Sequence, residues 1–351
     1  MTATLLLDPV DELTRRELLV SGLSLAALFA ASKTRPAAGA EPEGGAVPVT
    51  IEHKFGATEI PAEPRRVVAV GGSDLDALLA LGVVPVATSR FAEEHLDAIF
   101  SWAKDEVGDA ALPEVLDIYT DGVPFERVAA LGPDLILAVY SAIEQGDYDR
   151  LSRIAPTVAQ PKGFVDYGAS WQLMTRTIGR AVGHPERAGQ LVADVEAQLA
   201  QVRAAHPEFA GASGVMALDG GDGTYFYWPP PDQVGRFLAD LGFEVPAELA
   251  ELPEGTTRGQ ISAERVDLLD VDVLVWWYVD GESGRGQIRA NPLYSGLDVA
   301  TQGRDVFLYG TDLLNEAIGY PTVLSIPFLL DRLVPMLAAA VDGDPATEVT
   351  P

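Results

Sequence analysis

The order of the predicted strands and helices constrains the fold of this chain most. Short apolar strands alternate with helices in two series, and a stretch that is helical throughout separates the two series. In the first series, residues 67–70 form an apolar run rich in β-branched residues, and Ser73 and Asp74 then begin a helix that ends near Gly82. Further strands are predicted at residues 83–87 and 134–139, and helices at 125–131 and 147–154. This order predicts a mostly parallel sheet covered by helices on both faces.

The second series begins at Gly214 and follows the same rhythm. Strands are predicted at residues 215–218, 273–277 and 306–309, and helices at 233–241, 262–269 and 322–341. Between the two series, residues 170–182 carry one apolar face and reach about 20 Å as a helix, and the next helix begins at Pro185. We therefore predict an α/β fold: two three-layer α/β lobes joined by a single long bridging helix, with a ligand cleft between the lobes.

The N-terminus predicts export. Arg15 and Arg16 precede an uncharged apolar run at residues 18–31, which is about 14 residues long and too short to span a bilayer. The small residues at 38–40 complete a twin-arginine signal peptide at 1–40 with cleavage after Ala40. The alternative is an amphipathic helix that stays attached. The other predicted boundaries are a linker at 41–47, an N-terminal lobe at 48–167, the bridging helix at 168–190, a C-terminal lobe at 191–341 and a disordered tail at 342–351.

Charge and composition exclude several classes of function. The chain has 24 Lys+Arg against 52 Asp+Glu, a formal net charge of −28, which argues against nucleic acid or an anionic membrane surface as the partner. There is no cysteine, so disulfides, thiolate metal sites, cysteine nucleophiles and a lipid-bearing N-terminal cysteine are excluded. The four histidines, at positions 53, 95, 184 and 206, are far apart, so we predict no bare manganese or zinc site and no metal or other cofactor.

Several segments resemble a known family when they are read in order. They are 49–56 (VTIEHKFG), 58–68, 76–83, 129–137 (AALGPDLIL), 148–158, 261–267 and 291–294. Together they are similar to the substrate-binding proteins of iron–siderophore ABC importers, the class III periplasmic binding proteins with a helical backbone. The resemblance covers about residues 48–340 and implies a monomer that captures a ferric siderophore between two lobes and delivers it to a membrane permease, with no catalytic residues.

Two departures from that family matter. Relatives in Gram-positive bacteria carry a lipid-bearing cysteine near the end of the apolar leader, whereas this chain has Ser32 there. Hydroxamate-binding relatives often place an arginine before a first-lobe helix, whereas residues 118–124 contain none. The chain is therefore expected outside the cell membrane, extracellular, at the cell surface or periplasmic, without a lipid anchor, and the siderophore class stays open.

A receptor for a bulky ferric complex needs aromatic walls and a few polar donors beyond the carboxyl ends of the strands. The ligand-binding candidates are Ser73, Arg90, Trp102, Tyr119, Tyr140, Tyr227, Trp228, Trp277, Tyr278 and Arg289. Strand alternation makes one of Trp276 and Trp277 a core residue, and Phe226 is a likelier core residue than Tyr225 or Tyr227. Arg285 and Arg289 are placed in a glycine-rich loop. The alternative for Arg90 and Arg289 is pairing with the chain's many carboxylates.

The resemblance also implies docking to the permease through one glutamate on each lobe, for which Glu144 and Glu254 are the candidates and Glu264 the substitute. A haem or cobalamin carrier of the same fold is an alternative. An exported α/β enzyme is another, although the chain has no G-x-S-x-G elbow and residues 220–223 lack dinucleotide-binding spacing. A module that scavenges a siderophore without delivering it is not distinguished from a transport protein by sequence.

Overall fold

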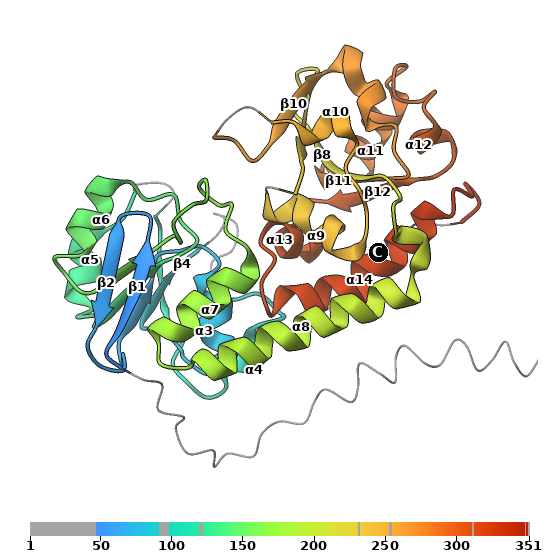
Figure 1. Cartoon of the computed structure of the whole chain (residues 1–351). Helices are drawn as coiled ribbons and strands as arrows, with labels where there is room; N and C mark the ends of the chain where they lie inside the picture. Colours follow the sequence, from blue (N-terminus) through green and yellow to red (C-terminus); the bar gives the residue numbers. More distant parts are fainter. Residues whose placement is uncertain are drawn as a thin grey trace, which may run out of the picture. The chain divides into compact units, whose positions relative to one another are not determined.

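The first lobe is organised around a five-stranded parallel sheet with the strand order β5-β4-β3-β6-β7. The computed structural model describes residues 47–90, 98–118, 122–230, 232–252, 255–310, 312–347 and 349 (Figure 1). The strands are β3 (Val67–Ala69), β4 (Ala87–Ser89), β5 (Glu114–Leu116), β6 (Leu135–Ala138) and β7 (Thr157–Ala159). The helices are α3 (Asp74–Ala80), α4 (Lys104–Val107), α5 (Phe125–Ala130) and α6 (Gln145–Leu151). An antiparallel hairpin, β1 (Val49–His53) and β2 (Gly56–Ile60), precedes them.

The second lobe contains a mixed five-stranded sheet with the order β10-β9-β8-β11-β12. Its strands are β8 (Gly214–Asp219), β9 (Thr224–Trp228), β10 (Gly259–Ser262), β11 (Val273–Val279) and β12 (Asp305–Tyr309). β8, β11 and β12 are parallel, whereas β9 and β10 run antiparallel to their neighbours. The helical segments are α9 (Gln233–Leu241), α10 (Ala247–Ala250), η3 (Ala263–Leu269), α11 (Gly281–Ala290), α12 (Asp298–Thr301), α13 (Leu313–Gly319) and α14 (Ser325–Val341).

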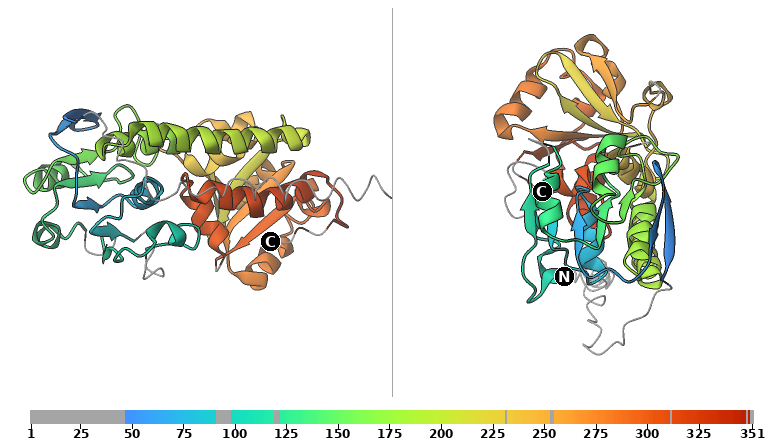
Figure 2. Two further views of the ribbon diagram at one scale, coloured as in Figure 1. Left: turned by 90° about the horizontal axis from the view of Figure 1, so that it is seen from below. Right: turned by 90° about the vertical axis from the view of Figure 1, so that its left-hand side faces the viewer.

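Two helices in succession connect the sheets. α7 (Trp171–Ala181) packs against β1 and α3 of the first lobe, and α8 (Pro185–Ala205) packs against α7 and then against α9 and α14 of the second. α8 is followed by η2 (Pro207–Phe209). Figures 1 and 2 show α8 running alongside α14. The bridging helix was predicted at 168–190, whereas the structure has two helices there: α7, which contacts the first lobe, and the 21-residue α8, which contacts α7 and the second lobe.

Close approach of α7 and α8 depends on one glycine. A Cβ atom at Gly179 would lie 2.3 Å from the Cβ atom of Ala188 on α8. A side chain at this position is therefore incompatible with the observed packing of the two helices.

One apolar cluster extends through both lobes. It contains Val67 and Leu135 from the first sheet and Val275 and Leu308 from the second, together with buried residues of α7, α8 and α14. Separate clusters fill the outer side of each sheet. The two lobes therefore share part of their hydrophobic core.

The prediction of which β9 side chains face the core is wrong. Tyr225 and Tyr227 are 4% and 5% exposed and belong to the core, whereas Phe226 is half-buried beneath the guanidinium of Arg258. The ring of Tyr227 occupies space left by Gly259 of β10, where a Cβ atom would lie 2.0 Å from the ring. Tyr227 was predicted to bind ligand, but its ring packs in this core.

Three other predictions differ from the structure. The strand predicted at 83–87 begins only at Ala87, and the glycine-rich loop predicted around Arg285 and Arg289 is helix α11. Residues 342–347, predicted as part of a disordered tail, form a turn in which the Asp342 carboxylate accepts from the Thr347 hydroxyl. The predicted signal peptide and all but the last residue of the predicted linker lie outside the described residues.

Candidate functional site

The carboxyl ends of β3 and β6 are joined by a buried aspartate. The carboxylate of Asp74 accepts hydrogen bonds from the backbone nitrogens of Val139 and Tyr140, at 2.8 and 2.9 Å. Burial raises the pKa of Asp74 to about 6, although these two hydrogen bonds lower it. Gly71 makes the arrangement possible, because a Cβ atom there would lie 2.2 Å from the carboxylate. The result is a fixed position for Tyr140, which the sequence predicts to bind ligand.

A second buried aspartate connects the two lobes. Asp76 Oδ2 accepts from Trp102 Nε1 at 2.9 Å and from Thr322 Oγ1 at 2.6 Å. Burial raises the pKa of Asp76, and both hydrogen bonds oppose that shift. The ring of Trp102 also contacts Phe328 of α14, with 5.3 Å between ring centroids. A first-lobe helix is thus fastened to the segment that begins α14.

A small cavity lies at this junction. It is partly open to solvent, and the space between its atoms, counted with the adjoining solvent, is about 280 Å³. Residues of both lobes line it: Gly72, Ser73, Leu75, Asp76, Ala98, Phe100, Trp102, Tyr320 and Thr322. We call it the Ser73 cavity. The Ser73 hydroxyl begins α3 but makes no capping bond, and this buried oxygen has no hydrogen-bond partner among the described residues. A buried hydroxyl left unsatisfied is unfavourable, so the position suits a ligand or water that can complete its hydrogen bonds.

Three tyrosines extend the site from this cavity. The ring of Tyr140 lies 5.0 Å from that of Tyr167 and 6.0 Å, edge on, from that of Tyr320, measured between centroids. Tyr140 and Tyr167 come from the first lobe and Tyr320 from the second. The aromatic surface therefore continues from one lobe to the other.

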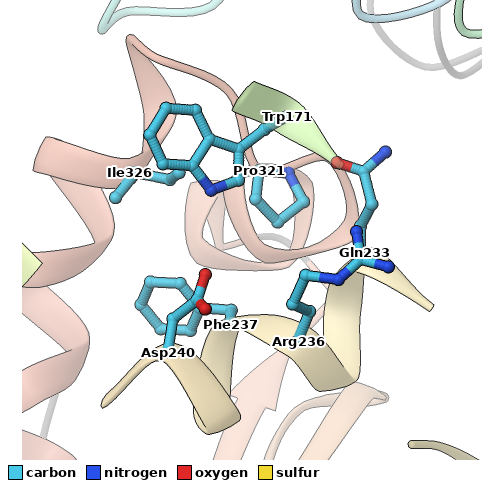
Figure 3. Close-up of a pocket in the computed structure, with 7 residues that line it drawn as sticks. All are labelled: Trp171, Gln233, Arg236, Phe237, Asp240, Pro321 and Ile326. Carbon is cyan, nitrogen blue, oxygen red and sulfur yellow. The ribbon is translucent and has the colours of Figure 1, made fainter. Parts of the chain in front are cut away.

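A second, narrow cavity lies where α7, α9 and the start of α14 meet (Figure 3), and the space between its atoms, counted with the adjoining solvent, is about 200 Å³. We call it the Arg236 cavity, and its lining residues are Trp171, Gln233, Arg236, Phe237, Asp240, Pro321 and Ile326. Figure 3 shows the indole nitrogen of Trp171 facing the carboxylate of Asp240. Gln233 is only 3% exposed, and neither polar atom of its amide has a hydrogen-bond partner among the described residues.

Arg236 supplies the positive charge of this cavity. Its Nη2 donates to the backbone oxygen of Gly168 in the first lobe at 3.2 Å. Burial lowers the pKa of the guanidinium, while Asp240, Asp232 and Tyr140 raise it. Through Gly168, Arg236 therefore joins the Arg236 cavity to the first lobe.

The end of β11 presents the second-lobe aromatic residues. Trp277 Nε1 donates to the backbone oxygen of Asn315 at 3.1 Å, and the Tyr278 hydroxyl donates to Glu316 Oε1 at 2.6 Å. Trp228 packs edge on against Trp277, with 4.9 Å between centroids. Tyr278 adopts a left-handed backbone conformation, with φ +53°, and is 37% exposed. A bulky residue in this conformation is strained, and such strain is concentrated at functional sites.

The prediction for the tryptophan pair is confirmed. Trp276 is fully buried and donates to the Tyr294 hydroxyl, whereas Trp277, on the other face of β11, is half-buried. Trp102, Ser73 and Tyr140 lie together at the junction of the lobes, and Trp228, Trp277 and Tyr278 lie together at the end of β11.

Other candidates lie apart from these groups. Arg90 forms an ion pair with Asp117, at 2.5 Å. Arg289 pairs with the buried carboxylate of Asp305, the first residue of β12 and thus at the opposite end of the strand from the predicted cleft. Tyr119 and Glu254 lie outside the described residues. Glu144 is exposed at the start of α6, and Glu264 is exposed with its carboxylate bonded by Ser262.

Sequence reasoning missed Asp76, Trp171, Gln233, Arg236 and Tyr320. For two of them a signal was present. Asp76 lies in an otherwise apolar run of α3, and Arg236 follows the apolar positions of a strongly amphipathic α9. A charged residue among helix positions expected to be buried is a candidate for a polar site.

Within the part of the chain that the structure describes, no group of three His, Cys, Asp or Glu side chains could hold a metal ion. No described helix has the length and apolar character needed to cross a bilayer.

Comparison with known proteins gives a consistent result. Residues 67–313 match the model of the family described as periplasmic binding protein. The ferric enterobactin-binding periplasmic protein FepB of Escherichia coli is 25% identical over 343 residues, which cover 92% of this chain and 97% of FepB.

Two solved structures are similar along nearly their whole length. A periplasmic solute binding protein from Mycobacterium smegmatis is 32% identical, with a TM-score of 0.73 over 85% of this chain and 99% of that chain. PiaA from Streptococcus pneumoniae, solved in complex with ferrichrome, is 25% identical, with a TM-score of 0.75 over 84% of this chain and 99% of that chain. Both matches extend across the two lobes described above.

Proposed function

The chain belongs to the periplasmic binding protein family, and on that basis we propose that it is an extracytoplasmic protein that captures a ferric siderophore and delivers it to the permease of an ABC importer. The observation that carries the proposal is the junction of the lobes. There, aromatic rings from both lobes surround two buried polar groups, the Ser73 hydroxyl and the Gln233 amide, that have no hydrogen-bond partner among the described residues. Large aromatic surface combined with a few polar atoms is suited to a bulky organic complex.

The names of two similar proteins support this ligand class. FepB is described as binding ferric enterobactin, and PiaA was solved with ferrichrome. Both are binding proteins, so in this proposal the chain performs capture and release without a chemical step and carries no cofactor.

Delivery requires a docking surface for the permease. Glu144, exposed at the start of α6, is the first-lobe candidate, and Glu254, with Glu264 as its substitute, is the second-lobe candidate. Carboxylates placed on both lobes would fix the orientation of the protein on a basic permease surface. We further propose that the protein acts as a monomer outside the cytoplasmic membrane, after export through its N-terminal signal.

The lobes are expected to move little when ligand binds. α8 packs against α7 and against α9 and α14, and the Asp76–Thr322 hydrogen bond ties α3 to the start of α14. Buried contacts of this kind restrict hinge motion, so the site is largely formed before the ligand arrives.

Tryptophan fluorescence tests the proposal directly, because Trp102 and Trp171 line the two cavities. The purified protein is titrated with ferric hydroxamate and ferric catecholate siderophores, their iron-free forms, haem, cobalamin, Mn²⁺ and Zn²⁺. We expect saturable quenching, with a micromolar or lower Kd, by a ferric siderophore and not by its iron-free form. Trp171→Phe should reduce the quenching. Trp276→Phe, a change at a fully buried core residue, should leave the decrease in fluorescence caused by the ligand unchanged. A response only to haem, cobalamin or bare metal, or no response, contradicts the proposal.

A further inference from the structure

Two arginines near the site, Arg236 and Arg90, are accompanied by carboxylates. A third, Arg332, lies over the Phe328 ring at an exposed position of α14. Arg236 is the only Lys or Arg among the described residues that line the two cavities, and Asp232 and Asp240 both act on its guanidinium. Arg90, beyond the end of β4, pairs with Asp117. Neither Arg236 nor Arg90 therefore brings an uncompensated positive charge to a ligand.

Three further carboxylates are buried around the same surfaces. Asp74 and Asp76 lie in the first turn of α3 and are 1% and 7% exposed; Asp74 is bonded to the Tyr140 backbone, and Asp76 lines the Ser73 cavity. Glu316, 3% exposed, lies beneath the Tyr278 hydroxyl, one helical turn before Tyr320. Counted by side-chain type, carboxyl groups outnumber the guanidinium of Arg236 at the junction.

Some segments between residue 47 and the C-terminus lie outside the described residues. Their sequences add no lysine or arginine. They are residues 91–97, 119–121, 231, 253–254, 311, 348 and 350–351, and their sequences contain no lysine or arginine but include Glu93, Glu94, Asp97 and Asp121. They therefore add no lysine or arginine to the junction.

The classes of ferric siderophore differ in charge. Three hydroxamates bring three negative charges to Fe³⁺ and give a neutral complex, which becomes positive if the ligand carries a free amine. Three catecholates bring six negative charges and give a triply negative complex, and citrate complexes are also negative. Placing a negative complex beside buried carboxylates is opposed by like-charge repulsion that is strong in a site of low dielectric constant.

We propose, on the premise of the function proposed above, that the ligand is a neutral or positively charged ferric complex of the tris-hydroxamate class, and that the site rejects ferric complexes of catecholates and citrate. The aromatic surface formed by Trp102, Tyr140 and Tyr320 supplies contact area that needs no ligand charge. Arg236 and the Gln233 amide supply directed hydrogen bonds to the oxygens of such a complex. This selectivity follows from the charges of this chain, not from the ligand of any similar protein.

A charge series of ligands tests the proposal. The purified protein is titrated at neutral pH with ferrichrome, which is neutral, ferrioxamine B, which is positive, and ferric enterobactin and ferric citrate, which are negative. We expect the first two to bind at least about 100-fold more tightly than the last two. The Kd for ferrichrome should change less than about twofold between low and high salt, because a neutral ligand has no net charge to screen.

A single substitution then separates charge from shape. Asp240→Asn removes one negative charge from the Arg236 cavity and should tighten ferric enterobactin binding at least about fivefold while changing ferrichrome binding less than about threefold. Glu126→Gln, on an exposed position of α5, is the matched control and should change neither. Thermal unfolding of each variant establishes that it is folded.

The outcomes distinguish this inference from the function on which it rests. If ferric enterobactin or ferric citrate binds as tightly as the hydroxamate complexes, the charge selectivity is wrong and siderophore capture stands. If none of the four ferric complexes binds, siderophore capture itself is wrong, and the selectivity is overturned with it.

Discussion

The carboxylate of Asp76 accepts a hydrogen bond from the hydroxyl of Thr322, with 2.6 Å between Oδ2 and Oγ1, across a separation of 246 residues in the chain. The same hydroxyl accepts from the backbone nitrogen of Ser325, and the Thr322 nitrogen donates to the Ser325 hydroxyl. The start of α14 and the first turn of α3 are thus held in one buried hydrogen-bonded group.

Removing the Thr322 hydroxyl should weaken this junction. Thr322→Val keeps the shape of the side chain but leaves the buried Asp76 carboxylate with one donor fewer, so we expect a loss of about 2 kcal/mol in the free energy of unfolding. Urea denaturation measures the loss. Thr301→Val, at an exposed position of α12, should cost less than about 0.5 kcal/mol. Equal effects of the two substitutions would contradict a structural role for the Asp76–Thr322 bond.

The buried carboxylate of Asp74 predicts a specific pH dependence. Its pKa is about 6 in the folded protein against an ordinary value of 3.8, so the folded state binds the proton more tightly than the unfolded state. The stability that this group contributes is fully present below about pH 4 and is lost as pH rises to about 6, and the total loss is roughly 3 kcal/mol. The free energy of unfolding of the wild type, measured relative to that of Asp74→Asn, should therefore decrease as the pH rises from 4 to 7. A difference that is constant over this range would show that Asp74 titrates as it does in the unfolded chain.

The left-handed conformation of Tyr278 predicts a small effect of substitution on stability and a large effect on binding. Tyr278→Gly removes a strain of about 1 kcal/mol but also removes the ring that packs against Trp277 and the hydroxyl bonded to Glu316, so the melting temperature should change by only a few degrees. Ligand affinity should fall at least about tenfold, because the aromatic surface at the end of β11 is lost. Calorimetric titration and thermal unfolding measure the two quantities. Unchanged affinity would place Tyr278 outside the site.

The placement of Arg289 predicts a substitution that affects folding and not binding. Arg289→Gln leaves the fully buried Asp305 carboxylate without its ion-pair partner, while the Tyr294 hydroxyl still donates to it. Since the Arg289 side chain is itself 37% exposed, we expect a loss near the lower end of the range for buried pairs, about 3 kcal/mol. Arg285→Gln, which removes a longer and exposed contact with Glu282, is the control and should be nearly neutral. If Arg289→Gln raises the Kd for the ligand and leaves the free energy of unfolding unchanged, Arg289 contributes to the binding site and this prediction is wrong.

Local signals account for the elements that were predicted well. Helix α9 has the predicted bounds because Asp232 caps its first turn through Val234 N, and Gly242, at φ +111°, ends it. These interactions join residues close together in the chain, so their residue types and spacing are visible in the sequence.

The faces of β9 could not be assigned in the same way. Alternation showed that Tyr225 and Tyr227 share a face, but apolar clusters cover both sides of this sheet. Which side accepts the two tyrosines depends on Gly259 of β10, whose missing side chain leaves room for the Tyr227 ring. That contact exists only after β9 and β10 have paired.

The same limit applies to the site. Ser73, Trp102 and Tyr140 were found from their positions near strand ends or their residue type, but the partners that complete the junction come from distant segments. Trp102 meets Asp76 and Phe328, and Arg236 meets the backbone of Gly168. Pairing of this kind is set by tertiary packing, and a single sequence carries no signal for it.

The apolar cluster shared by the two sheets has a consequence for how the polypeptide can be divided. Val67 and Leu135 belong to the same continuous cluster as Val275 and Leu308, through α7, α8 and α14. A break in the chain between α7 and α8 would leave each fragment with an exposed apolar surface that only the other can cover. The two halves are therefore obligate complements: produced separately they should aggregate, and produced together they should reassemble and melt in one heat-absorption peak.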